Sequence, residues 1–167
     1  MTPTELFANM PADLATEILE EVYQNNKPLN RDLLARLAQV KKMRPVAIQR
    51  MPRTERYPEI INILKNPLSA AMAFQSISSW LITKQEPMLV DFLGHLGIPH
   101  DGHGCCDDFP ENPPSRETLK SAVDFLLTKY PQPHVAVYLH AFNNMPDTCW
   151  DTLETLLADD ARLKFSP

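Results

Sequence analysis

Side chains that could bind a metal or attack a substrate are concentrated in one stretch, Gly94 to Pro114 (GHLGIPHDGHGCCDDFPENPP). It contains all four glycines of the chain, three of its five histidines and two of its three cysteines. Imidazole and thiolate groups are preferred ligands of zinc and related metals. The nitrogen, sulfur and oxygen donors of this stretch are His95, His100, Asp101, His103, Cys105, Cys106, Asp107 and Asp108.

If this stretch binds zinc, we expect His100, His103 and Cys105 to be the ligands. The spacing is not that of a familiar zinc site, because it has no CxxC pair and no HExxH helix. The simpler interpretation is a polar loop that joins two helical parts, with glycines at positions of positive φ and histidines in solvent. The sequence favours the loop, and the zinc site is kept as an alternative.

The same residues also suggest a thiol nucleophile. Cys105 or Cys106 beside His103 gives the residue types of a cysteine–histidine pair, and Asp101 adds a neighbouring carboxylate. Catalytic partners are usually distant in sequence and meet only in the fold, whereas these are neighbours. A metal- or thiol-dependent enzyme centred on residues 95–108 is therefore an alternative and not the favoured function.

Asp91 and Asp124 interrupt apolar helix faces, and His140 lies in an apolar run. The two aspartates could serve as a general acid and a general base, but nothing in the sequence brings them together. Burial with an ion-pair or hydrogen-bond partner is the usual explanation for such residues.

Basic residues dominate the middle of the chain. Residues 27–65 carry ten bases and three acids, residues 1–26 carry five acids and no Lys or Arg, and residues 66–167 carry thirteen acids and six bases. Within 41–56, six cations lie close together in sequence and could bind phosphates by charge. They are Lys41, Lys42, Arg44, Arg50, Arg53 and Arg56.

Nucleic-acid binding through residues 41–56 is the second alternative. Tyr57 is the only aromatic residue nearby, so base stacking has little support, and no helix-turn-helix or ribonucleoprotein motif is present. The net charge of −5 also argues against nucleic acid. We therefore favour a protein partner, including a second copy of the chain, since basic and acidic regions of two copies complement each other.

The composition, 44% hydrophobic and 22% charged, is that of a soluble globular protein. No stretch approaches the roughly 18 uninterrupted apolar residues of a membrane span, and the N-terminus lacks a secretory-signal pattern. An odd number of cysteines is typical of a reducing compartment. We expect a cytoplasmic protein that does not enter a membrane.

Apolar residues recur every three or four positions over most of the chain, which predicts helices. Sixteen prolines that interrupt apolar runs predict many short helices with defined starts. The pattern predicts an all-α single domain, 1–167, of about seven to nine short helices packed as antiparallel hairpins around one core. The Gly/His/Cys/Pro-rich loop at 94–114 joins its two helical parts.

An internal similarity suggests two related hairpins. Residues 80–84 (WLITK) resemble residues 125–129 (FLLTK), and each segment is followed by a proline that starts another apolar run. A period of about 45 residues is that of helical-hairpin arrays. Two similar hairpins, 67–96 and 116–143, are thus an alternative to a plain irregular helical domain.

Local signals place several helix ends. Asn30 is a favourable N-cap, a short helix is expected to start at Pro58, and Asp147 is expected to cap the last helix. The run at 134–142 fits a strand or a helix, and we choose helix because no partner strand is visible. The segment 87–95 is apolar nearly all round, which predicts a central helix.

Several enzyme classes lack their motifs in this chain: no GxGxxG or P-loop, no GxSxG elbow and no kinase signature is present. Helical hairpins often serve as platforms for partner segments, although a fold does not determine a function. The favoured function is a soluble helical protein-binding or scaffold protein without catalytic activity of its own and without a cofactor.

Overall fold

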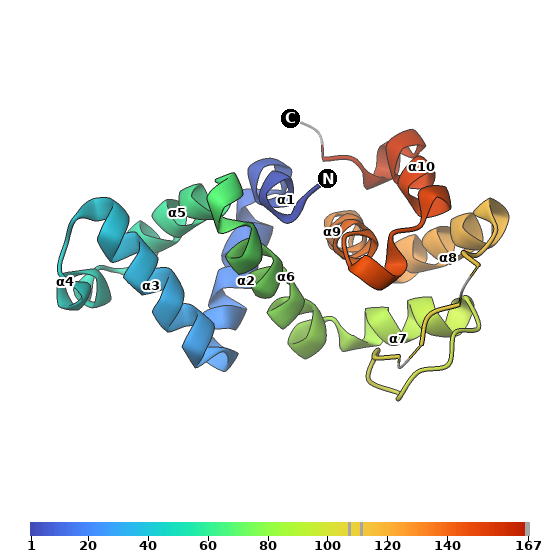
Figure 1. The fold of residues 1–167 in the computed structure, drawn as a ribbon, viewed down its shortest axis with the longest axis horizontal. Coiled ribbons are helices and arrows are strands. Elements are labelled where there is room, and N and C mark those ends of the chain that lie inside the picture. The colour runs from blue at the N-terminus through green and yellow to red at the C-terminus, as the bar shows by residue number, and fades with distance from the viewer. Residues whose placement is uncertain (107, 111, 166–167) are drawn as a thin grey trace. The chain divides into compact units, whose positions relative to one another are not determined.

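The computed structural model describes residues 1–106, 108–110 and 112–165. Within these residues every regular element is helical, with ten α-helices and no strand, which confirms the all-α fold class (Figure 1). The chain divides into two compact units, Met1–Trp80 (unit 1) and Leu81–Pro167 (unit 2). Each unit has its own buried apolar side chains.

Unit 1 is built around α3 and α5. α3 packs against α2, α4 and α5, and α5 also contacts α1, α2 and the 3₁₀ turn η1. The fully buried side chains include Phe7, Ile18, Leu37, Leu64 and Trp80. The elements are α1 (Pro3–Asn9), α2 (Ala12–Asn25), α3 (Lys27–Lys41), α4 (Pro45–Arg50), α5 (Arg53–Leu64), η1 (Pro67–Ser69) and most of α6 (Ala70–Lys84).

The start of α3 differs from the prediction. It begins at Lys27, because the side chain of Asn26 accepts the N–H of Leu29 at 3.2 Å and so caps the helix. Pro28 then lies in the first turn, where its missing N–H breaks no helical hydrogen bond. Asn30 is therefore inside the helix, and its assignment as the cap was wrong.

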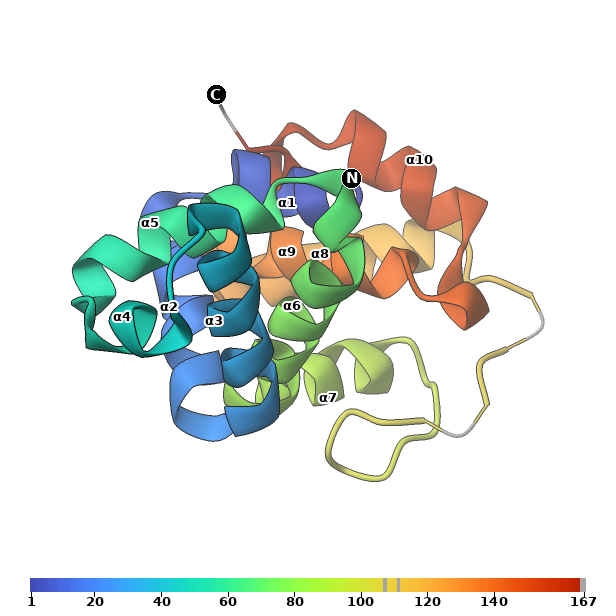
Figure 2. The same cartoon turned by 60° about the vertical axis from the view of Figure 1, so that its left-hand side comes forward.

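Unit 2 is built around α8 and α9. α8 packs against α7, α9 and α10, and α9 also contacts η2 and η3. The long non-helical stretch between α7 and α8 is yellow in Figure 2. After the end of α6, the elements are α7 (Glu86–His95), α8 (Arg116–Lys129), α9 (Gln132–Asn143), η2 (Pro146–Thr148), α10 (Asp151–Asp159) and η3 (Ala161–Leu163).

The ambiguous run at 134–142 is part of a helix, α9, as chosen. Every residue from 135 to 142 is buried, so the run is apolar because the helix is covered on all sides. α9 is thus the central helix of unit 2. The segment 87–95 does not have that role, since α7 buries one face through Met88, Leu89, Phe92 and Leu93.

Two further helix starts were misplaced. α5 begins at Arg53 and continues through Pro58, which gives up one intrahelical hydrogen bond inside a helix that packs against three others. Asp147 lies in η2, and α10 begins at Asp151. Pro58 and Asp147 are residue types that often begin a helix, but packing determines that α5 begins before Pro58 and α10 begins after Asp147.

α8 and α9 are joined by only Tyr130 and Pro131 and pack against each other, so they form the expected hairpin within 116–143. The segment 67–96 is divided between the two units, since α6 crosses the boundary after Trp80. Its similarity to the second hairpin stays a prediction.

Candidate functional site

The loop after α7 contains a closed turn at residues 101–105. The Asp101 carboxylate accepts the backbone N–H groups of His103 (2.7 Å) and Cys105 (3.1 Å). The N–H of Asp101 donates to the carbonyl of Cys105 at 2.9 Å. The bonds from the His103 and Cys105 backbones hold the pKa of Asp101 below its usual value. The hydrogen bonds of Asp101 therefore stabilise the conformation of the loop.

Three glycines of this loop have the positive φ that the loop interpretation predicts: 69° at Gly97, 86° at Gly102 and 83° at Gly104. Gly104 also lies very close to α7. A Cβ atom built on Gly104 would be 2.5 Å from the Cβ of Leu89, a distance that real side chains do not tolerate. The loop therefore packs directly on α7 at Gly104, because only glycine leaves room for the side chain of Leu89.

The three predicted zinc ligands have separate surroundings. His100 Nδ1 accepts the N–H of Gly102 at 3.1 Å, and His103 Nδ1 lies 3.0 Å from Glu86 Oε1. Cys105 is exposed and forms no disulfide. In the described ranges, no three His, Cys, Asp or Glu side chains are grouped to hold an ion, while Asp107 lies outside them. The zinc site stays a prediction without support from this geometry.

The partner of His103 also bears on the thiol alternative. The imidazole contacts Glu86 of α7, whereas Asp101 is bonded to backbone N–H groups. The carboxylate hydrogen-bonded to the imidazole is therefore that of Glu86, which the sequence did not indicate, and not that of Asp101. Cys106 and Cys149 form no disulfide either.

We expect Glu86→Gln to lower the pKa of His103. The hydrogen bond that the protonated ring donates to Glu86 and the negative charge of Glu86, with a smaller effect of Asp101, raise this pKa above its usual value. The contact of the protonated ring with Glu86 is present at low pH and is lost as the pH rises through the His103 pKa. An NMR titration of the His103 ring measures this pKa. Glu117→Gln, at an exposed acid of α8, is the control, and an unchanged midpoint in Glu86→Gln would contradict the assignment.

Asp91 is held in an ion pair. Lys129 Nζ lies 2.6 Å from Asp91 Oδ2, and the hydroxyl of Tyr130 donates to the same oxygen at 2.6 Å. Burial raises the pKa of Asp91, but the bonds from Lys129 and Tyr130 outweigh it and bring the pKa below its usual value. Burial and the bond to Asp91 raise the pKa of Tyr130 to about 12. These contacts join α7 to the end of α8.

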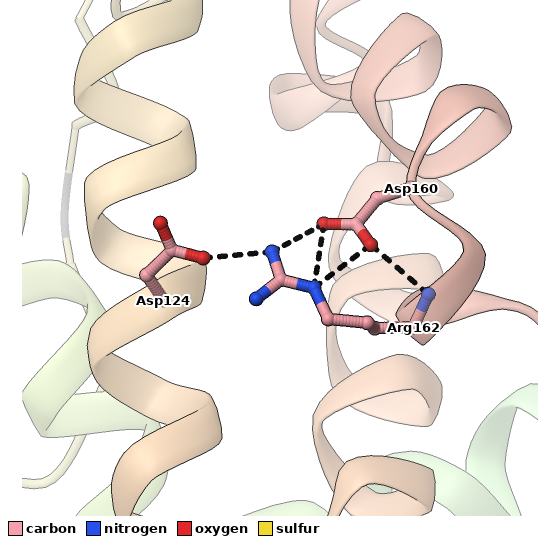
Figure 3. A network of polar contacts seen from close by, with 3 residues as sticks. All are labelled: Asp124, Asp160 and Arg162. Carbon is pink, nitrogen blue, oxygen red and sulfur yellow. Dashed lines mark hydrogen bonds and ion pairs between the residues drawn. The ribbon is translucent and has the colours of Figure 1, made fainter.

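Asp124 belongs to a second network. Arg162 Nη2 lies 2.7 Å from Asp124 Oδ1 and 2.6 Å from Asp160 Oδ2, so one guanidinium bridges α8 and η3 (Figure 3). The bonds to Asp160 and then to Asp124 raise the pKa of Arg162. Asp91 and Asp124 thus each have a cation of their own, as the structural explanation of these residues requires.

Half of the six predicted binding cations are engaged within unit 1. Lys41 forms an ion pair with Glu59, and Arg53 forms one with Glu20. Arg56 is buried, with 8% of its surface exposed. The phosphate-binding array expected at 41–56 is therefore reduced to Lys42, Arg44 and Arg50, which are exposed and have no ion pair in the described part of the chain.

Tyr57 is not available for stacking on a base. It is buried, and its hydroxyl donates to Glu20 Oε2 at 2.7 Å. Burial and the bond to Glu20 raise the pKa of Tyr57 to about 12. The Arg53 guanidinium lies 4.7 Å from the centre of the Tyr23 ring, so it too packs against its own unit.

The three unpaired cations lie beside exposed apolar side chains. Six large apolar side chains are exposed in the described residues, and three of them fall within seven positions: Val40 (55%), Met43 (40%) and Val46 (56%). α4 packs beside α3, so the segment 40–50 that carries these side chains lies where these two helices meet at one end of unit 1 (Figures 1 and 2). We name this surface the basic-apolar patch: Val40, Lys42, Met43, Arg44, Val46 and Arg50.

The backbone is strained in the middle of the patch. Lys42, at φ 53° and ψ 37°, is the one non-glycine residue with positive φ in the ranges that the structure describes. It ends α3, and the N–H of Met43 bonds to the carbonyl of Ala38 at 3.0 Å. Glycine is the usual residue here, and a side chain costs about 1–2 kcal/mol. A cation at a helix C-terminus recovers only about 0.3–1 kcal/mol.

Unit 2 has an open cleft of about 640 Å³ that the sequence did not reveal. Two segments far apart in the sequence form it: the glycine-rich loop and the region from η2 to the start of α10. The lining residues used below are Asp108, Phe109, Pro146, Asp147, Trp150 and Asp151, and we name this the aspartate cleft. Among the described residues that line it, none is basic.

Comparisons with protein-family models, with curated proteins and with solved structures found no match to this chain. None of the helices in the described residues is long and apolar enough to cross a membrane.

Proposed function

We propose that this protein is a protein-binding or scaffold protein without catalytic chemistry of its own, and that the basic-apolar patch binds an acidic segment of a partner protein. The observation that carries the proposal is the exposure of Val40, Met43 and Val46 within seven residues, beside three cations that have no carboxylate partner among the described residues. Exposed apolar side chains grouped with polar neighbours are typical of protein–protein interfaces.

The apolar centre of the patch favours a protein over a nucleic acid. A phosphate backbone would use Lys42, Arg44 and Arg50 but would leave Val40, Met43 and Val46 in water. Tyr57, the aromatic residue nearest to the patch in sequence, is buried and cannot stack on bases. A partner with acidic and apolar side chains would satisfy both halves of the patch.

The conformation of Lys42 gives a second reason to place function here. A glycine at this position would relieve the strain, so the lysine is expected to be present for its charge. A strained backbone conformation supports a functional role when the residue lies in an exposed apolar and charged surface. Lys42 meets this condition, since Met43 and Arg44 follow it in the chain and are exposed.

The partner in this proposal is a protein, with a second copy of the chain included, and the location is the cytoplasm. The odd cysteine count supports a reducing compartment, and none of the three cysteines forms a disulfide.

The test is NMR titration of the labelled full-length protein with a short amphipathic peptide that has leucines on one face and glutamates on the other. We expect amide shifts centred on residues 40–50. Arg44→Glu with Arg50→Glu, the patch variant, should weaken binding on the order of 100-fold, because like charges then face each other. Arg31→Glu with Lys65→Glu makes the same change of charge at other exposed positions of unit 1 and serves as the control.

Lys42→Gly adds a readout that separates function from folding. We expect it to stabilise unit 1 by about 1 kcal/mol, since glycine tolerates the left-handed conformation, while binding of the acidic peptide becomes weaker. Thermal unfolding and the same titration measure the two effects. Tighter binding by Lys42→Gly would contradict the role of its charge.

The alternatives appear as other outcomes of the same titration. Shifts at residues 40–50 with a single-stranded polynucleotide, but none with the acidic peptide, would replace the proposal by nucleic-acid binding. Stoichiometric metal in untagged protein, bound by His100, His103 and Cys105, would replace it by a metal-dependent activity.

A further inference from the structure

The charges of unit 1 and unit 2 are opposite. Residues 1–80 carry ten bases and eight acids, and residues 81–167 carry six bases and thirteen acids. Two copies that approach with unit 1 of one facing unit 2 of the other therefore attract each other, while like units repel.

The aspartate cleft carries negative charges that complement the positive charges of the basic-apolar patch. Asp108, Asp147 and Asp151 are exposed and form no ion pair in the described part of the chain. Within the described residues, three carboxylates without an ion pair thus line the cleft and no basic side chain does, while unit 1 presents three cations without an ion pair.

The walls of the cleft can also receive apolar side chains. Phe109 lies edge-on to Trp150 with ring centres 6.3 Å apart, and both line the cleft together with Pro146. Aromatic and proline surfaces are suitable contacts for side chains such as those of Met43 and Val46.

We infer that the acidic partner of the basic-apolar patch is the aspartate cleft of a second copy of this chain. This inference rests on the proposed function, because it names the occupant of that same patch. Patch and cleft are different surfaces, so the contact is heterologous, and a dimer still has one free patch on one copy and one free cleft on the other. The chain then forms dimers and longer open assemblies as its concentration rises.

The test uses sedimentation of the full-length protein over a range of concentrations. We expect the average mass of the wild type to rise with concentration, and to fall when salt increases from about 50 to about 500 mM, because exposed charge pairs are screened. The patch variant, Arg44→Glu with Arg50→Glu, should associate on the order of 100-fold more weakly. The cleft variant, Asp108→Lys with Asp147→Lys, should behave likewise; Asp151 is left unchanged because it lies in the first turn of α10.

Mixing the two variants is the decisive measurement. The patch variant keeps an intact cleft, the cleft variant keeps an intact patch, and the reversed patch of one is complementary to the reversed cleft of the other. The mixture should therefore associate in alternating order about as strongly as the wild type, although each variant alone associates weakly. A single chain that carries all four changes should associate again, since its reversed charges are complementary. Circular dichroism and thermal unfolding of each variant check that it folds, and Arg31→Glu with Lys65→Glu is the charge-matched control.

A wild-type chain that stays monomeric at all concentrations would overturn the inference, as would a mixture that forms no dimer. If the acidic peptide still shifts residues 40–50 in that case, the proposed function stands and only the identity of the partner is wrong. If the peptide does not bind, the proposed function fails as well.

Discussion

Phe142→Ala is expected to lower the free energy of unfolding of unit 2 by about 3–5 kcal/mol, the usual cost of removing a buried aromatic ring. Phe142 lies edge-on to four other aromatic rings. Its ring centre is 5.3 Å from those of Phe92 and Trp150, 5.6 Å from that of Phe109 and 5.9 Å from that of Tyr138. Since Phe109 and Trp150 line the aspartate cleft, we expect the cleft to lose its shape too.

Hydrogen exchange of the α9 amides measures this effect, because exchange from a buried helix reports the opening of unit 2. Phe125→Ala is the matched control. Phe125 is half-buried at the edge of α8 and stacks on His95 at 5.1 Å, so its loss should cost clearly less. Equal loss of protection in both variants would mean that Phe142 is not central to the packing of unit 2.

Gly104→Ala is expected to destabilise the loop and unit 2 by about 2–5 kcal/mol. The new side chain would adopt a φ of 83°, and its Cβ would lie 2.5 Å from the Cβ of Leu89. Leu89 is buried in unit 2, so neither group can move without disturbing α7 or the closed turn at 101–105. We expect the loop to leave α7 and the contact between His103 and Glu86 to be lost.

Gly102→Ala separates strain from steric conflict. Gly102 has nearly the same φ, 86°, but an added Cβ would meet no atom within 4 Å. Gly102→Ala should therefore destabilise unit 2 only through the strain of a left-handed backbone at alanine, about 1–2 kcal/mol. Thermal unfolding and the pKa of His103 are measured for both variants. Equal effects of the two substitutions would show that the contact of Gly104 with Leu89 does not hold the loop.

Much of the local structure follows from rules that act within one helical turn. Serine is a favourable N-cap residue, and the hydroxyl of Ser115 accepts the N–H of Thr118 at 3.2 Å at the start of α8. The positive φ of Gly97, Gly102 and Gly104 was expected in the same way. These outcomes depend only on side-chain reach and backbone sterics, so neighbouring residues determine them.

Competing local signals needed the fold to decide between them. Asn26 and Asn30 are both residues that favour an N-cap. Only Asn26 caps the observed α3, which places Pro28 in the first turn. The run at 134–142 has no visible period because α9 is buried on every side. Periodicity identifies a helix with one exposed face, and it is lost in a helix without one.

The sequence by itself determined the all-α class, the contrast of charge along the chain and the loop at 94–114. Only the tertiary structure decided which cations remain unpaired, since Lys41 meets Glu59 and Arg53 meets Glu20 across separate helices. The physical reason is range: helix propensity and capping act between near neighbours, whereas exposure and ion pairing depend on residues that meet only after the helices pack.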